Sequence, residues 1–214
     1  VRMLVRPYGG SGVYVPAVNK GELQFALANA LETRYAVTGT GAYKDRQQAD
    51  IRVVSVMLPL RVAMFTRKDS PIKSITDLKG KRVPGVFAAA RTLKVLMDGQ
   101  LANANMTYAD VAVERMRKFV PVAYALKVNP GKRLAGIVKP TYVMAYPYLV
   151  LTSSKVSDDT VYKVAKAMWG NRKAMMAAFR PMAGFGQDKM VTDLGPVKYH
   201  PGAIKFYKEK GLWK

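Results

Sequence analysis

Hydrophobic and polar positions along the chain follow two different periods, and together these periods predict a mixed α/β fold. Ile51–Met57 is a nearly continuous run of isoleucine and valine, which is typical of a buried strand, and Leu60–Thr66 follows Pro59 as a second strand. Other apolar segments of strand length lie at Val1–Arg6, Leu23–Ala28, Arg82–Val86, Ala123–Val128 and Tyr142–Leu151.

Helical spacing marks other segments. Ala88–Gly99 places Leu93, Leu96 and Met97 on one face and is predicted to be a helix. Ser157 is predicted to cap the helix that follows it, and Ser74 is predicted to cap a short helical turn, with Asp77 three residues later in an imperfect capping box. Shorter helical segments are expected at Ser74–Leu78, Asn171–Phe179 and Pro201–Leu212, a turn at Asn19–Glu22, and loops at Pro7–Gly12 and Tyr35–Gly41.

The length and composition bound the organisation of the protein. The chain has 214 residues and is 50% hydrophobic, which suffices for one large domain or two smaller lobes. No run of eighteen apolar residues is present, so we expect no direct insertion into a membrane. The first residues lack the apolar segment of a signal peptide, which leaves two interpretations: a cytoplasmic protein, or a chain that starts after processing.

The chemistry available for catalysis is limited. The chain has no cysteine and one histidine, so thiolate sites and multi-histidine metal sites are excluded. The single histidine, His200, has no neighbouring base or nucleophile and is interpreted as a structural residue of the C-terminal turn. We therefore expect no catalytic residue, no metal and no cofactor.

The formal charge of +21 makes a nucleic-acid or polyanion binder an alternative. The basic residues are dispersed, however, and the runs Arg67-Lys68 and Lys79–Arg82 are shorter than a basic tail. A dispersed positive field favours the attraction of anions in general, so we expect a small anionic solute and no nucleic acid as the partner.

Two segments are candidates for binding such an anion. The loop Gly9-Gly10-Ser11-Gly12 can bring backbone N–H groups and a hydroxyl to a carboxylate, although an ordinary tight turn explains it equally well. The helix start near Ala88 places Arg91 and Thr92 in its first turn, where an anion is favoured. For Arg91 alone, a solvated surface position is the simpler interpretation. Tyrosines that could line a ligand cleft, but more often pack in a core, are Tyr8, Tyr14, Tyr142, Tyr146 and Tyr148.

Several segments resemble one known family. The tail Tyr199–Trp213 is similar to the C-terminal signature of the TAXI family, the solute receptors of TRAP (tripartite ATP-independent periplasmic) transporters. Asp69–Val83 resembles an element found in many type II periplasmic binding proteins. Gly9-Gly10-Ser11, followed by Lys20–Leu27, is similar to the family's Gly-Gly-Ser loop and the strand after it, and Tyr142–Leu151 resembles its late hinge-side strand.

The resemblance implies a type II periplasmic binding fold, in which two α/β lobes hold a ligand in a cleft at the hinge. Residues 1–66 would then belong to the first lobe, 67–140 to the second, and 141–214 to the return into the first lobe. It further implies a periplasmic monomer, its signal peptide removed, that delivers a glutamate-like or oxoacid carboxylate to the membrane subunits of a TRAP transporter. Carried onto this chain, the binding residues would be Gly10, Ser11, Tyr14, Asn29, Ala89, Arg91, Thr92 and Tyr142.

The chain also departs from the family. Relative to the family pattern, a strand, a loop and a helix are missing before Val1, and a second gap lies near Asp110–Glu114. We therefore expect a shortened version of the receptor. An enzyme on the same fold is a further alternative, because a fold does not determine a function.

Overall fold

The computed structural model describes residues 4–82, 92–102, 110–131, 134 and 137–213, without the side chains of residues 102 and 110–113. The chain divides into two compact units: unit 1 contains residues 1–59 and 147–214, and unit 2 contains residues 60–146. Two long strands, β2 (Ile51–Val62) and β4 (Thr141–Ser153), each run from one unit into the other. The lobe boundaries suggested by the sequence stay a prediction.

The sheet of unit 1 is built on β4. The strand β1 (Phe25–Asn29) pairs antiparallel with β4, so that Asn29 lies opposite Tyr148, and β4 also neighbours β2. The C-terminal part of the chain extends the sheet beyond β2. Val53 and Tyr199 form a parallel bridge, in which the Val53 N–H donates to the Lys198 carbonyl at 2.9 Å and the His200 N–H donates to the Val53 carbonyl at 2.9 Å.

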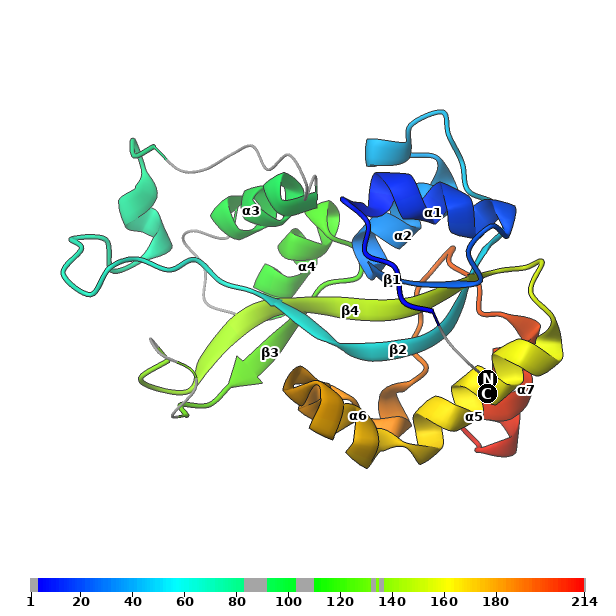
Figure 1. Cartoon of the computed structure of the whole chain (residues 1–214). Helices are drawn as coiled ribbons and strands as arrows, with labels where there is room; N and C mark the ends of the chain where they lie inside the picture. The colour runs from blue at the N-terminus through cyan, green and yellow to red at the C-terminus, as the bar shows by residue number, and fades with distance from the viewer. Residues whose placement is uncertain (1–3, 83–91, 103–109, 132–133, 135–136, 214) are drawn as a thin grey trace. The chain divides into compact units, whose positions relative to one another are not determined.

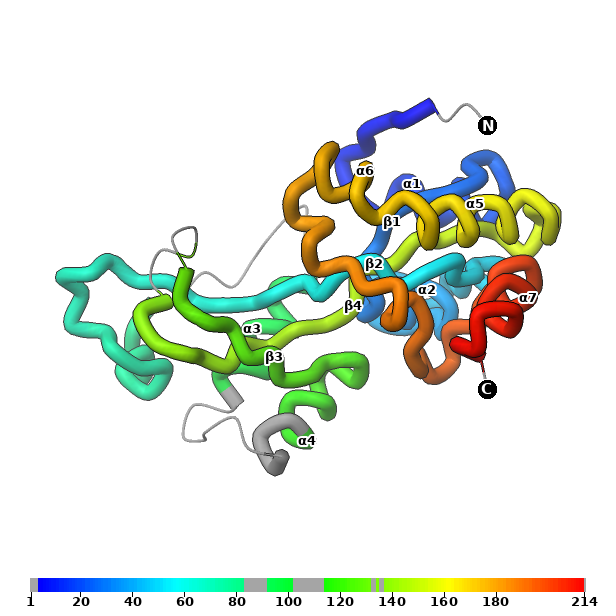
Figure 2. Tube along the Cα trace, turned by 90° about the horizontal axis from the view of Figure 1, so that it is seen from below, coloured from blue at the N-terminus to red at the C-terminus, as the bar shows by residue number. Residues whose placement is uncertain are grey.

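Helices cover both faces of the unit 1 sheet (Figure 1). The helices α1 (Ser11–Lys20) and α2 (Ala30–Thr38) lie on one face. On the other face lie α5 (Asp158–Gly170), α6 (Arg172–Ala178) and α7 (Pro201–Glu209), which are nearest the viewer in Figure 2. The fully buried side chains between these layers include Leu31, Ile51, Leu149, Leu151, Phe185, Phe206 and Tyr207.

Unit 2 pairs a short hairpin with two helices. The strand β3 (Tyr124–Val128) is antiparallel to the first half of β4. The helix α3 (Thr92–Ala102) packs on α4 (Asp110–Phe119), with Leu96 and Met116 buried in the unit. The Gln100 amide donates to the carbonyl of Val62 at 3.1 Å, which ties α3 to the end of β2. Single-turn 3₁₀ helices complete the two units: η1 (Gly41–Tyr43), η2 (Ile75–Leu78), η3 (Arg180–Gly184) and η4 (Gln187–Lys189).

Several expectations from the sequence are confirmed. The predicted strands in β1, β3 and β4 are present, and Ser157 caps α5 by accepting a hydrogen bond from the Thr160 N–H. Ser74 and Asp77 form a capping box at η2, because a short polar side chain at each of these positions reaches the other's backbone N–H. The fold is mixed α/β, as the alternating periods predicted, and the structure adds that the sheet is open with antiparallel pairing of β1 and β3 on β4.

Other expectations were wrong near the N-terminus. Leu4–Arg6 forms no strand, because no neighbouring strand supplies its hydrogen bonds in the described residues. The loop predicted to reach Gly12 already ends at Gly10, because α1 begins at Ser11. The loop predicted at Tyr35–Gly41 instead contains the last turn of α2, which runs to Thr38 and stops at Gly39 in the left-handed conformation.

The remaining corrections concern strand and helix ends. Pro59 does not break the strand but lies within β2, the terminal strand of the β1-β4-β2 path, where a missing N–H is tolerated. The helix predicted to end at Gly99 continues to Ala102, because Gly99 is buried against α4. The helix α4 begins at Asp110, in a segment where no element was predicted from the sequence. The helix start at Ala88 and most of the strand at Arg82–Val86 lie outside the described residues.

Candidate functional site

The glycine-rich loop ends at the N-terminus of α1. Gly10 is the N-cap residue, and no side chain caps the helix from this position. The first turn of α1 contains no acidic residue. Because the first N–H groups of a helix lack intrahelical partners and carry partial positive charge, this helix start can attract a carboxylate.

A carboxylate of the chain itself lies at this helix start. The hydroxyl of Ser11, the first residue of α1, donates a hydrogen bond to Oε1 of Glu32. The second oxygen, Oε2, accepts a hydrogen bond from the amide of Asn29 at 3.2 Å. Glu32 is half-buried. The loop was expected to attract a carboxylate from solution. The carboxylate found at this helix start is instead that of Glu32, a residue of α2.

Local sequence explains why Glu32 is held there. Asn29 ends β1 and is the N-cap of α2, where its Oδ1 accepts a hydrogen bond from the Glu32 N–H at 2.8 Å. The Thr33 hydroxyl donates to the Asn29 carbonyl at 2.8 Å. A glutamate three residues after an N-cap is favoured by the helix dipole. The strand-to-helix turn therefore fixes the backbone of Glu32, and Ser11 and Asn29 fix its side chain.

Three tyrosines surround this group. The Tyr14 hydroxyl donates to the Leu27 carbonyl at 2.7 Å, and the Tyr43 hydroxyl donates to the Ser11 carbonyl at 3.1 Å. Burial, reinforced by the negative charge of Glu32, raises the pKa of Tyr14, and burial also raises the pKa of Tyr148. These phenols therefore stay protonated at neutral pH and offer polar tips on apolar rings.

The predicted binding residues fall into three sets. Ser11, Tyr14 and Asn29 lie together in unit 1 and are joined through hydrogen bonds or electrostatic contact with Glu32, and Gly10 precedes Ser11 as the N-cap of α1. Thr92 and Tyr142 belong to unit 2, and Ala89 and Arg91 lie outside the described residues. The sequence analysis missed Glu32, although its spacing from Asn29 is that of an N-cap and the third helical residue.

The two described candidates in unit 2 differ in exposure. Thr92 begins the described part of α3, and only 5% of its surface is exposed. Tyr142 is 44% exposed and lies opposite Lys127 in the β3–β4 pairing. Of the two, only Tyr142 offers an accessible side chain.

His200 has a structural role, as predicted. Its Nδ1 accepts a hydrogen bond from the Gly202 N–H at 3.2 Å and thereby caps α7. Its Nε2 lies 3.0 Å from the Val156 carbonyl, to which it donates in the tautomer fixed by Gly202. Both ring nitrogens are thus used by the backbone, and the ring is buried.

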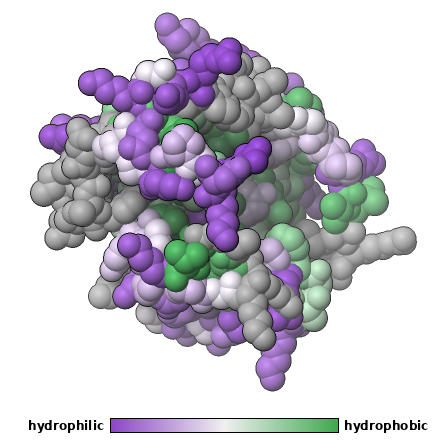
Figure 3. Space-filling model, turned by 90° about the vertical axis from the view of Figure 1, so that its left-hand side faces the viewer, coloured by the Kyte–Doolittle hydropathy of each residue, from purple (hydrophilic) through white to green (hydrophobic). Residues whose placement is uncertain are grey.

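Net positive charge per residue is higher in unit 2 than in unit 1. Residues 60–146 contain sixteen lysines and arginines but only five acidic residues, more than half of the excess charge of the chain. On the face shown in Figure 3, hydrophilic residues predominate among those coloured, and hydrophobic residues form separate patches. A field of this kind attracts anions over distances of about a Debye length, ~10 Å at moderate salt.

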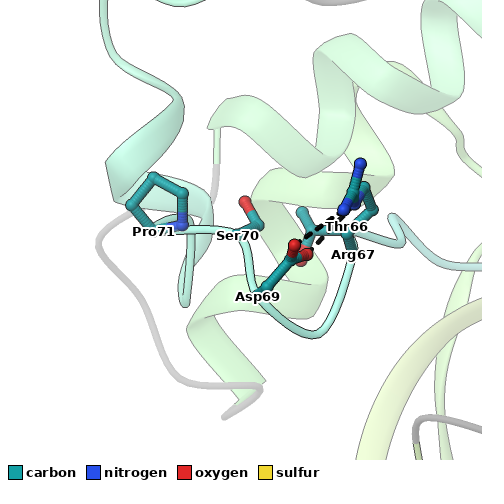
Figure 4. A pocket seen from close by; sticks show the side chains of 5 residues that line it. All are labelled: Thr66, Arg67, Asp69, Ser70 and Pro71. Carbon is teal, nitrogen blue, oxygen red and sulfur yellow. Dashed lines mark hydrogen bonds and ion pairs between the residues drawn. The ribbon is translucent and has the colours of Figure 1, made fainter.

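A surface depression of about 450 Å³ lies in unit 2 and is lined by Thr66, Arg67, Asp69, Ser70 and Pro71 (Figure 4). The Arg67 guanidinium donates two hydrogen bonds to the Asp69 carboxylate, at 3.0 and 2.7 Å. Both side chains are largely exposed. Because the cation is already paired within the same turn, this depression is a weak candidate for binding an anionic solute.

Neither a metal centre nor a membrane span is found in the part of the chain that the structure describes. Its acidic residues and His200 form no group of three that could hold a metal ion. None of its helices is both long enough and apolar enough to cross a membrane.

Comparison with protein families gives a match over nearly the whole chain. The sequence model of the NMT1-like family matches residues 1–140 and residues 96–211. The chain belongs to the NMT1-like family. The two matched ranges overlap over residues 96–140, and together they include both the Ser11–Glu32 group and α7.

Membership of the NMT1-like family gives the coarse function of the protein. The family comprises substrate-binding proteins with a fold of the periplasmic binding type, which are generally not enzymes and are typically extracytoplasmic. This NMT1-like protein is accordingly a solute-binding protein, consistent with the predicted capture of a small solute.

Proposed function

We propose that this NMT1-like protein is the extracytoplasmic receptor of a TRAP transporter of the TAXI type, and that it captures a small carboxylate for the membrane subunits. The observation that carries the proposal is the grouping of Gly10, Ser11, Tyr14 and Asn29 in unit 1. These residues come from a loop, a helix and a strand end. They are also the unit 1 residues that the TAXI resemblance assigns to the ligand.

The charge distribution supports the choice of a carboxylate. Residues 60–146 carry slightly more than half of the net positive charge, and the candidates Arg91 and Thr92 fall in this part of the sequence. Guanidinium groups bind carboxylates through two parallel hydrogen bonds. We further propose that units 1 and 2 are the two lobes of a type II periplasmic binding fold, in which crossing strands join the lobes.

A thermal-shift screen of the full chain tests the proposed function. Glutamate, glutarate and 2-oxoglutarate are added to the purified protein, together with the uncharged control glutaramide. A ligand at one hundred times its Kd stabilises the folded state by about 2.7 kcal/mol, so a bound carboxylate should raise Tm by several degrees. No change in Tm with any of the carboxylates would contradict the proposal.

Salt dependence separates this function from polyanion binding. A small carboxylate involves few charges, so its Kd should change little between 50 and 200 mM salt. A nucleic-acid binder that contacts six to ten phosphates would lose about 10³- to 10⁵-fold in affinity over the same range. Tight, steeply salt-dependent binding of an oligonucleotide, without binding of any small acid, would favour the alternative.

A further inference from the structure

Glu32 is a half-buried carboxylate that has no cationic partner among the described residues. The ion pairs formed by Glu22, Asp50, Asp69, Asp98 and Asp159 are exposed surface pairs with lysine or arginine. Among the described residues, Glu32 forms no ion pair, and its carboxylate accepts hydrogen bonds from the neutral side chains of Ser11 and Asn29.

This environment holds a negative charge in place without neutralising it. Glu32 is half-buried, so part of its hydration is lost, and the raised pKa values of the nearby Tyr14 and Tyr148 keep both phenols neutral. A partly desolvated carboxylate attracts an opposite charge more strongly than one in bulk water does. The α1 N-terminus favours the negative charge, and the two side-chain donors fix the direction of the carboxylate.

We propose that Glu32 is a specificity-determining residue that receives a primary ammonium group of the solute. The inference rests on the proposed function and narrows it. The captured carboxylate would carry an amino group and would belong to the amino acids rather than to the oxoacids or plain dicarboxylates. Ser11 and Asn29 act as positioning residues for the Glu32 carboxylate, and the tyrosine rings supply apolar walls that strengthen the contact with the cation.

The same charge acts against solutes without an amine. A ligand carboxylate placed beside Glu32 would be repelled by its like charge. A ligand carbonyl oxygen placed there could form no hydrogen bond with Glu32, because both groups are acceptors. Leaving a buried polar group unpaired is the usual source of strong discrimination between ligands that differ by a single group. The preference should therefore appear between solutes that are identical except for the amine.

Isothermal titration of the full chain with glutamate, glutarate and 2-oxoglutarate tests the inference. These probes share two carboxylates and differ at one carbon, which bears an ammonium group, only hydrogens, or a carbonyl. Glutamate should bind about 10- to 100-fold more tightly than the other two, the range expected for one charge-assisted hydrogen bond. Equal affinity for all three would overturn the ammonium inference but leave the proposed function intact. Binding of none of them would overturn both.

Substitution of Glu32 separates recognition from a merely structural role. Glu32→Gln keeps the size and polarity of the side chain but removes its charge, and should abolish most of the preference for glutamate over glutarate. Glu22→Gln makes the same charge change at an exposed ion pair with Lys20 and should leave the preference unchanged.

Tm is measured for both variants. If Glu32→Gln lowers Tm but the ratio of the glutamate affinity to the glutarate affinity does not change, Glu32 only stabilises α2 and the inference is wrong. Ser11→Ala removes one hydrogen bond to the Glu32 carboxylate without changing any charge. It should therefore partially reduce the ratio of the glutamate affinity to the glutarate affinity.

Discussion

Asn29 and Glu32 bond to each other in both directions: the Glu32 N–H donates to Asn29 Oδ1 at 2.8 Å, and the Asn29 amide donates to Glu32 Oε2 at 3.2 Å. One bond caps α2 and the other orients the carboxylate. The stability of the helix start and the geometry of the candidate site therefore depend on the same pair of side chains.

Replacing Asn29 by alanine should lower the free energy of unfolding by about 1 kcal/mol, because the N-cap bond to α2 is lost. Asn129→Ala is the matched control, since Asn129 is exposed and caps no helix in the described part of the chain. Urea denaturation measures both. A loss for Asn129→Ala as large as that for Asn29→Ala would show that the capping bond is not the cause.

Tyr207→Phe should destabilise the protein by about 1–2 kcal/mol. The Tyr207 hydroxyl is buried and donates to the Val54 carbonyl at 2.6 Å, so its removal leaves a buried acceptor unpaired. Tyr162→Phe removes a hydroxyl that bonds Glu209 at the surface, where water replaces it, and should cost less than about 0.5 kcal/mol. Chemical denaturation of the two variants under identical conditions gives the comparison, and equal losses would contradict it.

Two glycine substitutions should act in opposite directions. A Cβ at Gly202 would come within 2.2 Å of the backbone oxygen of Asp158, so Gly202→Ala must push α7 away from the start of α5 and should cost about 1–3 kcal/mol or more. A Cβ at Gly170, in the last turn of α5, meets nothing within 4 Å. Gly170→Ala should stabilise by up to about 1 kcal/mol through helix propensity. Thermal unfolding distinguishes the two, and a neutral Gly202→Ala would refute the predicted close packing.

Stability should fall as the solution is acidified from pH 7 to pH 5. Burial lowers the pKa of His200 below its usual value of about 6.5, although the nearby Asp158 opposes the shift. Below that value the unfolded chain binds a proton that the folded chain resists, so the free energy of unfolding increases with pH in this window. Above it, both states are neutral and the dependence ends.

His200→Gln provides the test of that pH dependence, because His200 is the only histidine of the chain. Urea denaturation at several pH values between 5 and 7.5 should show a smaller slope in the variant than in the native protein. An unchanged slope would assign the effect to other groups. The lowered pKa values of Asp50 and Asp77 affect stability only at more acidic pH, below their usual range near 4.

Local patterns in the sequence predicted the elements whose signals lie within a few residues. The strand at Ile51–Met57 and the caps at Ser157 and Ser74 are all encoded by neighbouring side chains. The turn predicted at Asn19–Glu22 begins two residues later, because α1 continues to Lys20. The absence of cysteine and the single histidine likewise limit the chemistry that the side chains can perform. The helix α1 was missed because Pro16 and three β-branched valines weaken its propensity, and its burial against the sheet supplies the missing stability.

What the sequence alone determined is the class of the protein: an α/β chain with a strong positive charge and few catalytic groups, similar to solute receptors. Only the tertiary structure brought Ser11, Asn29 and Glu32 together, and with them the neighbouring Tyr148. Ser11 lies 21 residues before Glu32, and Tyr148 lies on a strand more than a hundred residues later. Periodicity reports which face of an element is buried, but not which side chains of distant elements meet, because that depends on strand pairing and helix packing across the whole unit.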